Sequence, residues 1–203
     1  MRRPTQTALK AERRLRGSPA ETRARLVAAA AELFNRDGYL GTDTVRIARA
    51  AGYAAGTFYK HFPDKRAALL AAYESWVTAE WRAVEQEMAA GGSAREMADR
   101  IVRLVLDLHV RWRGLRAALA TLLATDAEAR RFHRDQRRRQ LAMMSALRER
   151  RGRRQRSSEA DAVLLFTLER TCDAVASGEL RDLSLDRDAT LAVLRRLLEE
   201  ALG

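Results

Sequence analysis

The sequence predicts an all-α protein, and three observations support this. Apolar residues recur at helical spacing, as in Leu26, Ala30, Leu33 and Phe34. Capping residues and glycines divide the 203 residues into segments of helical length, about nine in all. No segment shows the alternating apolar and polar pattern that predicts strands. With 47% hydrophobic and 32% charged residues, the chain has the composition of a folded protein with a core.

The first helix is predicted to begin after Ser18 and to end at Gly38. Ser18 is placed as its N-cap, Pro19 suits the first helical position, and Glu21 completes a capping box. We expect Gly38 to end the helix in a left-handed cap. Residues 1–17 precede it as a basic arm with few apolar residues, which we expect to be disordered when free.

Two short helices follow the first one. The N-cap cluster Thr42-Asp43-Thr44 precedes a helix over 45–51, Gly52 breaks it, and a second helix covers about 55–61. Two such helices joined by a glycine-containing turn are typical of a helix-turn-helix. Neither is long enough to be stable alone, so both must pack on the first helix. The side chains expected to face inward are Val45, Ile47, Ala48, Phe58 and Phe62.

The rest of the chain predicts a helical bundle over residues 66–203. Its boundaries are set by Pro63-Asp64, by Gly91-Gly92-Ser93, by a break at Gly114, and by caps at Asp126, Ser157 and Asp186. The expected helices cover 65–89, 97–112, 115–125, 127–150, 158–177 and 187–202, with a loop over 151–156. The resulting division is an arm (1–17), a helix-turn-helix domain (18–65) and a larger second domain (66–203).

The net charge of +11 is concentrated near the start of the chain. Residues 1–66 hold 14 Lys and Arg against six Asp and Glu, a net charge of +8, whereas residues 67–203 hold 24 against 21. Of the 38 basic residues 35 are Arg, which a mutational bias can explain, but such a bias does not explain their placement. The asymmetry indicates an anionic partner for the first third, with nucleic acid ahead of a membrane surface.

Several classes of protein are disfavoured by the sequence. No run approaches the roughly 18 apolar residues of a membrane span, and the basic start lacks the apolar core of a secretory signal. Cys172 is the only cysteine, which excludes an intrachain disulfide and fits a reducing cytoplasm. The three histidines show no metal-ligand spacing, and no catalytic or cofactor-binding motif is found. We therefore expect a cytoplasmic protein with no metal, no cofactor and no enzymatic activity.

The most informative segment is Thr42–Arg66, which reads TDTVRIARAAGYAAGTFYKHFPDKR. It resembles the DNA-binding domain of the TetR family of bacterial transcription regulators, over about residues 19–75. The resemblance is carried by an ordered set at the family's spacing: Ile47-Ala48, Ala51-Gly52, Gly56-Thr57-Phe58-Tyr59, His61-Phe62 and Lys65. It departs from the family at Ala54, where a serine-like cap is common, and at Tyr53, where a valine-like residue is common.

A recognition helix over 55–61 has the residue types that DNA contact requires. Small residues at its start let the backbone approach DNA, and hydroxyls and cations reach phosphates or base edges. For Lys60 the alternative to DNA contact is a solvated surface lysine, and for Tyr59 it is packing under the next helix. The basic arm either follows the minor groove of DNA or only solubilises the chain. The resemblance adds backbone contacts at the start of the preceding helix. The predicted DNA-binding residues are Thr42, Thr44, Arg46, Ala55, Gly56, Thr57, Tyr59, Lys60, His61 and Lys65.

The second domain is expected to hold a small-molecule effector between its helices. The predicted lining residues are Trp76, Leu108, His109, Trp112, Met144, Phe166 and Arg170, with Trp81 and Leu104 as further candidates. For each of them the alternative is ordinary core packing. Arg170 either anchors an anionic ligand or pairs with Glu169 or Asp173. The arginine run over 130–139 is expected to be an exposed helix face.

The last two helices suit dimerisation, as in the resembled family. One apolar stripe comprises Leu165, Leu168, Cys172 and Val175, and another comprises Leu191, Leu194, Leu198 and Ala201. We expect a homodimeric transcription regulator, a repressor that binds a pseudo-palindromic double-stranded operator and is released by a small effector. The alternatives are an activator of the same family and a non-specific, nucleoid-like DNA-binding protein.

Overall fold

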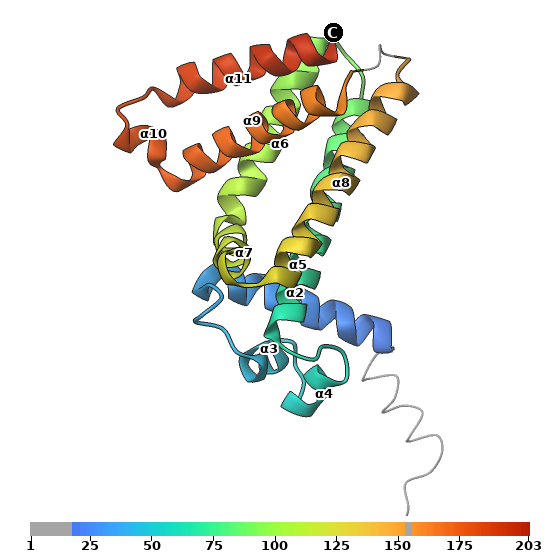
Figure 1. Ribbon diagram of the computed structural model, residues 1–203, viewed down its shortest axis with the longest axis vertical. Helices are drawn as coiled ribbons and strands as arrows, with labels where there is room; N and C mark the ends of the chain where they lie inside the picture. The colour runs from blue at the N-terminus through green and yellow to red at the C-terminus, as the bar shows by residue number, and fades with distance from the viewer. Residues whose placement is uncertain (1–17, 153–155) are drawn as a thin grey trace, which may run out of the picture.

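The computed structural model describes residues 18–152 and 156–203, and its described part contains ten α-helices and no strand (Figure 1). The all-α prediction is confirmed. The predictions for the basic arm and for residues 153–155 lie outside the described residues. The helices are α2 (Pro19–Asp37), α3 (Thr44–Ala50), α4 (Ala55–Tyr59), α5 (Lys65–Ala89), α6 (Ala94–Arg111), α7 (Arg113–Thr125), α8 (Ala127–Arg150), α9 (Ser158–Ser177), α10 (Glu179–Asp182) and α11 (Arg187–Leu202). The four-residue α10 is the helix that the sequence did not predict.

Local capping residues place the helix starts where the sequence predicts them. The capping box is present, because the Glu21 amide donates to Ser18 Oγ at 3.2 Å and the Ser18 amide donates to the Glu21 carboxylate at 2.6 Å. The predicted caps Asp126, Ser157 and Asp186 each accept a hydrogen bond from the first turn of their helix. Gly38 does end α2 with a positive φ of 70°, but its ψ of 179° lies outside the left-handed helical region that we expected.

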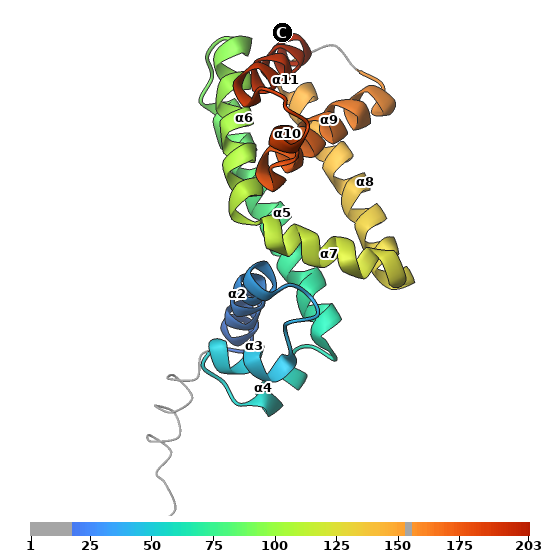
Figure 2. The same ribbon diagram turned by 90° about the vertical axis from the view of Figure 1, so that its left-hand side faces the viewer.

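The helices alternate in direction along a long molecule (Figures 1 and 2). α2, α3 and α4 form one end, and α5 leads away from them to the opposite end. α6 returns, α7 crosses the junction next to α2, and α8 leads out again. α9 and α11 then cover α6. The helix-turn-helix therefore occupies one end of the molecule and the last two helices lie near the other.

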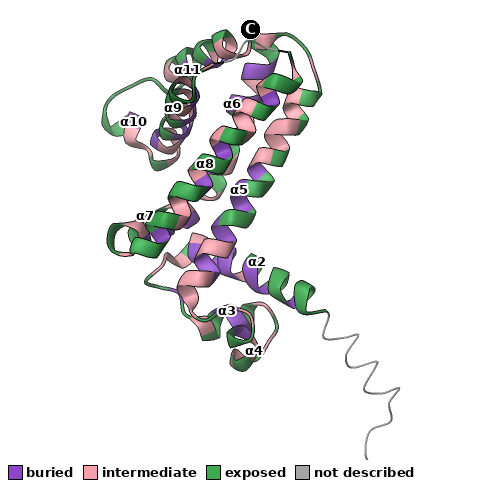
Figure 3. Ribbon diagram, turned by 45° about the vertical axis from the view of Figure 1, so that its right-hand side comes forward, coloured by how far each residue is buried: buried purple, intermediate pink, exposed green. Residues whose placement is uncertain are grey.

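Two apolar cores hold this arrangement, and buried stripes mark them along the helices (Figure 3). The first joins the helix-turn-helix to the second domain, since Leu26, Phe34 and Phe58 belong to the same cluster as Leu115 and Leu119 of α7. The second lies between α6, α9 and α11. The first core thus crosses the predicted domain boundary near residue 65.

The predicted helix break at Gly114 is displaced by two residues. The chain leaves helical geometry at Trp112, and Gly114 lies in the first turn of α7. A Cβ at Gly114 would lie 1.8 Å from the carbonyl oxygen of Asn35 in α2, so only glycine fits this approach. The Asn35 side chain spans the break: its Nδ2 donates to the Arg111 carbonyl at 2.9 Å and its Oδ1 accepts from the Leu115 amide at 3.0 Å.

The apolar stripes predicted for dimerisation point mostly into the chain's own core. Leu165, Cys172, Leu191, Leu194 and Leu198 are buried within the single chain, so these side chains are not available to a partner. The apolar residues of α6 pack against the faces of α9 and α11 that the sequence assigned to the dimer. The exposed apolar residues of α9 and α11 are instead Val163, Phe166, Val193 and Leu197. Val45, predicted to pack inward, is also exposed.

Among the described residues, no helix is long and apolar enough to cross a membrane.

Candidate nucleic-acid interface and effector cavity

The helix-turn-helix is assembled by α3, α4 and the turn between them. Gly52 supplies the turn with a φ of 83°, and the Tyr53 amide closes it by donating to the Ala48 carbonyl at 2.9 Å. Ile47 and Phe58 are fully buried in the core shared with α2. Two helices of seven and five residues are therefore held by tertiary packing, as their length requires.

One face of α4 is open to solvent. Gly56 and Lys60 are exposed, and Tyr59 keeps 58% of its surface. A methyl group at Gly56 would meet no atom within 4 Å, so its backbone is free to approach a ligand closely. Ala54 occupies the N-cap without a side-chain hydrogen bond, which confirms that this helix lacks the usual cap. The predicted residues Ala55, Thr57 and His61 are partly buried at the same end of the molecule.

The exposed α4 is tied to α3 by a hydroxyl pair. Thr44 Oγ1 and the Tyr59 hydroxyl are 2.9 Å apart, so these two predicted contacts also set the spacing of the two helices. Arg46 donates to the Gly41 carbonyl and to the Asp37 carboxylate. Hydrogen bonds from Arg36 and Arg46 lower the pKa of Asp37 to about 2, so the carboxylate stays charged at neutral pH.

Two predicted DNA contacts hold the loop between α2 and α3. Thr42 is buried, and its hydroxyl donates to the Gly38 carbonyl at 2.9 Å. Lys65 Nζ donates to the carbonyls of Tyr39 and Thr42 at 2.9 and 3.1 Å and lies 4.4 Å from the centre of the Tyr39 ring. In this structure both side chains position the loop, and contact with DNA through them stays a prediction.

The second domain contains a cavity of about 110 Å³ between α5, α6, α8, α9 and α11. Most of its lining is apolar. The apolar residues are Trp81, Val84, Met88, Ile101, Val105, Met144, Leu147, Leu164, Leu165, Leu168, Leu198, Ala201 and Leu202. The charged residues are Glu80, Arg148, Arg151, Arg156, Asp161 and Glu169. Sequence reasoning missed these charged groups, because Glu80 comes from α5 and the other five from α8, α9 and the segment between them, and only the fold brings them to one cavity.

Of the seven predicted effector residues, Met144 lines this cavity and the other six do not. Trp76, Leu108 and Trp112 line a separate open groove next to α2. Phe166 is half exposed. Arg170 donates to the Glu179 carboxylate at 2.7 Å, so its partner is neither Glu169 nor Asp173. Helical periodicity identified apolar faces here, but it did not indicate which face opens onto a cavity.

The sixth, His109, belongs to a buried charge network. Its Nδ1 is 2.9 Å from Asp173, and Arg116 makes two hydrogen bonds to the same carboxylate at 2.9 and 2.6 Å. Burial alone would raise the pKa of Asp173, but the hydrogen bonds from His109 and Arg116 lower it to about 2. Burial would likewise lower the pKa of His109, and its carboxylate partners Asp173 and Glu80 raise it instead.

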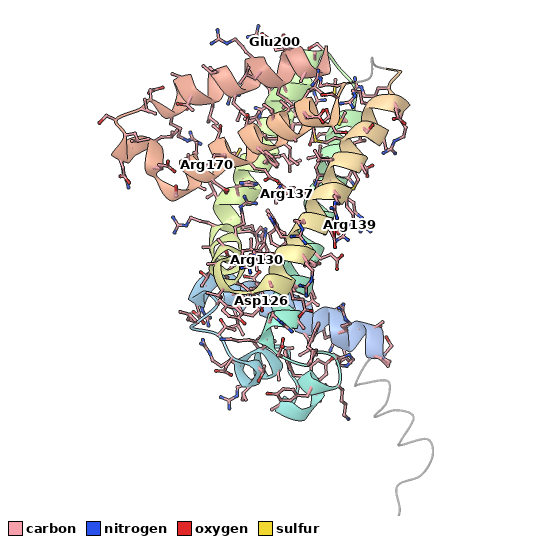
Figure 4. The ribbon with its side chains drawn as sticks, in the orientation of Figure 1. Asp126, Arg130, Arg137, Arg139, Arg170 and Glu200 are labelled. Atoms are coloured by element: carbon pink, nitrogen blue, oxygen red, sulfur yellow. The ribbon has the colours of Figure 1, made fainter. Side chains whose placement is uncertain are left out.

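The arginine run of α8 is not a uniformly exposed face, contrary to the prediction. Arg138 is exposed, but the side chain of Arg137 is only 21% exposed and reaches Glu169 on α9 (Figure 4). Arg139 donates to Glu74 on α5 at 3.3 Å. Part of the run therefore connects α8 to its neighbours.

Comparison with known proteins supports the resemblance. The family model described as bacterial regulatory proteins, tetR family, matches residues 26–72. Among curated proteins, no match is found.

Solved structures share the fold over nearly the whole chain. A TetR-family transcriptional regulator from Mesorhizobium loti aligns with a TM-score of 0.70 at 18% identity, covering 92% of this chain and 96% of that chain. A transcriptional regulator from Saccharomonospora viridis in complex with choline aligns with a TM-score of 0.63 at 24% identity, covering 89% and 95%. FadR from Bacillus subtilis in complex with stearoyl-CoA aligns with a TM-score of 0.59 at 18% identity, covering 88% and 96%.

The fold and the exposed short helix define the class of helix-turn-helix proteins. Within that class, residues 26–72 carry the N-terminal domain of the TetR family, and the resemblance that the sequence predicted is confirmed.

Proposed function

We propose that the protein is a homodimeric transcriptional repressor that binds a pseudo-palindromic operator through α3 and α4 and is released by a small effector in its second domain. The observation that carries the proposal is the exposed face of α4 on a packed helix-turn-helix. Gly56 and Tyr59 of α4, and Lys60 directly after it, are open to solvent, and the other face of the helix is fixed by Phe58. Such a helix can enter a major groove without unfolding its support.

A dimer follows from the size of the recognition helix. Five residues of α4 read too few base pairs for specificity, whereas two copies related by a two-fold axis read two half-sites. The exposed apolar residues Val163 and Phe166 of α9 and Val193 and Leu197 of α11 supply a surface for the second copy. The dimer therefore uses the last two helices, through their exposed apolar residues and not through the buried stripes that the sequence favoured.

The effector signal has a short physical route to the DNA-binding end. α5 belongs to both domains, and α7 shares the core of α2 and is hydrogen-bonded to Asn35. A change in helix spacing around the cavity would move α7 and α5 and so alter the distance between the two recognition helices. Two proteins of similar fold were solved with choline and with stearoyl-CoA, which supports a ligand in this domain. Effector and operator should then weaken each other's binding by the same factor.

DNA selection tests the proposal directly. The purified chain is mixed with random-sequence duplexes, and selected sequences are tested by gel shift at increasing salt. A specific dimer should enrich a two-fold symmetric sequence and retain its preference over random DNA, whereas a purely electrostatic binder should lose affinity for all duplexes alike. A promoter carrying the selected site in front of a reporter should become more active when the gene is deleted; lower activity would indicate an activator.

Lys60→Ala probes the recognition helix itself. We expect a loss of about 1–3 kcal/mol for the selected sequence if Lys60 reads a base, and an equal loss on all duplexes if it contacts only phosphate. Arg138→Ala is the matched control, because it removes an exposed cation from α8. Unchanged DNA binding in Lys60→Ala would contradict the assignment of α4 as recognition helix.

A further inference from the structure

The effector cavity combines an apolar body with a cluster of guanidinium groups at one end. Arg148, Arg151 and Arg156 lie where α8 ends and α9 begins, at the end of the molecule far from α3 and α4 (Figure 1). Arg151 reaches the Met88 carbonyl at the end of α5, and Arg156 reaches the Ala201 carbonyl at the end of α11. Four helix ends and three cations therefore meet at this end of the cavity.

Not every charged side chain that lines the cavity has an oppositely charged partner. Arg148 is paired with Asp161, a carboxylate that is only 3% exposed. Glu169 is paired with Arg137, which lies outside the cavity lining, and Glu80 faces His109 Nε2 at 3.5 Å. Within the described part of the chain, no carboxylate lies within ion-pair distance of Arg151 or Arg156. Among the described residues, Arg151 and Arg156 are therefore the arginines of the cavity lining that have no carboxylate partner.

Both guanidinium groups keep donors for a ligand. A guanidinium has five N–H groups. Arg151 uses its Nη1 on the Met88 carbonyl at 3.1 Å and on Met97 Sδ at 2.8 Å, and Arg156 uses its Nη2 on the Ala201 carbonyl at 3.0 Å. Arg148 Nε, on the same cluster, is buried without a hydrogen-bond partner among the described residues. Planar guanidinium groups with free donors match the two oxygens of a carboxylate.

We propose that the effector is a small amphiphilic carboxylate whose apolar body fills the 110 Å³ cavity and whose carboxylate binds Arg151 and Arg156. This inference rests on the proposed function, because it names the ligand class of the same cavity. A dry cavity of about 150 Å³ holds benzene, so this smaller cavity suits an apolar body of roughly four to six carbon atoms. Hexanoate and benzoate are probes of this size and charge.

The test compares head groups on one apolar body. Titration calorimetry of the full chain is run with hexanoate, hexanol, hexyl phosphate and hexyltrimethylammonium at equal ionic strength. We expect hexanoate to bind at least tenfold more tightly than hexanol, and the cation to bind more weakly than either. A preference for hexyltrimethylammonium would assign the cavity to a cation facing Glu80 and overturn the proposal. Stronger binding of the phosphate, equal binding of the alcohol, or no binding by hexanoate or benzoate would each overturn it as well.

Matched variants locate the site. Arg151→Gln and Arg156→Gln should each weaken hexanoate binding about tenfold and leave hexanol binding unchanged. Arg150→Gln is the control, because Arg150 is exposed and pairs with Glu85 away from the cavity lining. Val84→Phe, at a partly buried lining position, should fill the cavity and abolish binding of both probes. Thermal melts confirm that each variant is folded; hexanoate binding that survives in the folded arginine variants overturns the proposal.

Gel shifts with the unliganded protein separate the two proposals. Selective DNA binding without carboxylate binding would refute the effector class and leave the regulator function intact. Carboxylate binding without selective DNA binding would refute the function and leave the ligand assignment intact.

Discussion

Two glycine-to-alanine substitutions should have opposite effects on stability, because their surroundings differ. At Gly114 the added Cβ would lie 1.8 Å from the Asn35 carbonyl oxygen, whereas real Cβ contacts stay beyond about 3.0 Å. The obstacle is main chain, so α7 must recede from α2 by about 1.2 Å or lose its helical geometry. The same movement would lengthen the hydrogen bonds that Asn35 makes across the break between α6 and α7. Overpacking of this kind costs about 1–3 kcal/mol.

Gly56→Ala is the matched control for Gly114→Ala. Both glycines lie in helices, but a Cβ at Gly56 meets nothing within 4 Å. Alanine in a helix is favoured over glycine by up to about 1 kcal/mol, so Gly56→Ala should leave the free energy of unfolding unchanged or raise it. If the backbone of α4 approaches DNA closely, the added methyl should weaken operator binding by about 1–3 kcal/mol.

Thermal denaturation at fixed protein concentration measures the difference, since the melting temperature of a dimer depends on concentration. For a chain of this size, 1 kcal/mol corresponds to about 2–4 °C, so Gly114→Ala should lower Tm by about 2–12 °C. Gel shifts on the same two variants complete the comparison. If Gly114→Ala is as stable as the parent chain, or if Gly56→Ala is the less stable of the two, the proposed tight approach between α2 and α7 is wrong.

Three further predictions concern the buried charge network around Asp173, the helix-turn-helix and the buried thiol of Cys172. Asp173→Asn should lower stability by about 1–3 kcal/mol, because it leaves Arg116, whose side chain is 14% exposed, without its carboxylate. The pKa of Asp173 is lowered to about 2 in the folded state, so its contribution is fully present above the unfolded pKa near 3.8 and is lost as pH falls toward 2; urea titrations of the parent and Asp173→Asn should therefore differ at pH 6 and converge in acid. Tyr59→Phe removes the hydroxyl that is hydrogen-bonded to Thr44, which should cost at most about 0.5–1.5 kcal/mol because the pair is exposed. Amide hydrogen exchange in α4 should then be faster, and identical exchange rates would argue against this hydrogen bond. Burial raises the pKa of the Cys172 thiol to about 12, so a thiol reagent at pH 8 should label the folded chain only as fast as it unfolds, and rapid labelling without denaturant would contradict its burial.

Local sequence signals predicted the helices well because helix ends are determined locally. The Ser18 capping box and the caps at Asp126, Ser157 and Asp186 each act within one helical turn, so their positions can be inferred without tertiary information. The helix-turn-helix was predictable for a related reason, since the buried residues Ile47 and Phe58 lie within six positions of Gly52 on either side. The family match over residues 26–72 confirms that part of the prediction.

Six of the seven predicted effector residues lie outside the cavity, because a cavity is defined by several distant segments. Trp76, Leu108 and Trp112 have the composition of a ligand site, but they line a groove elsewhere. Five of the eight residues in the predicted dimer stripes are buried for a similar reason, because the apolar face of α11 packs against α6 within the same chain. A helical period shows that a face is apolar, and it does not show which surface covers that face.

By itself the sequence determined the helical class, most of the helix boundaries and the TetR-type helix-turn-helix, because caps, periodicity and short-range spacing act over a few residues. Only the tertiary structure decided that Gly114 lies against Asn35, that Lys65 holds a loop, and that Arg151 and Arg156 face an apolar cavity without carboxylate partners among the described residues. These features depend on contacts between segments far apart in the chain, and such contacts are set by how the two cores pack.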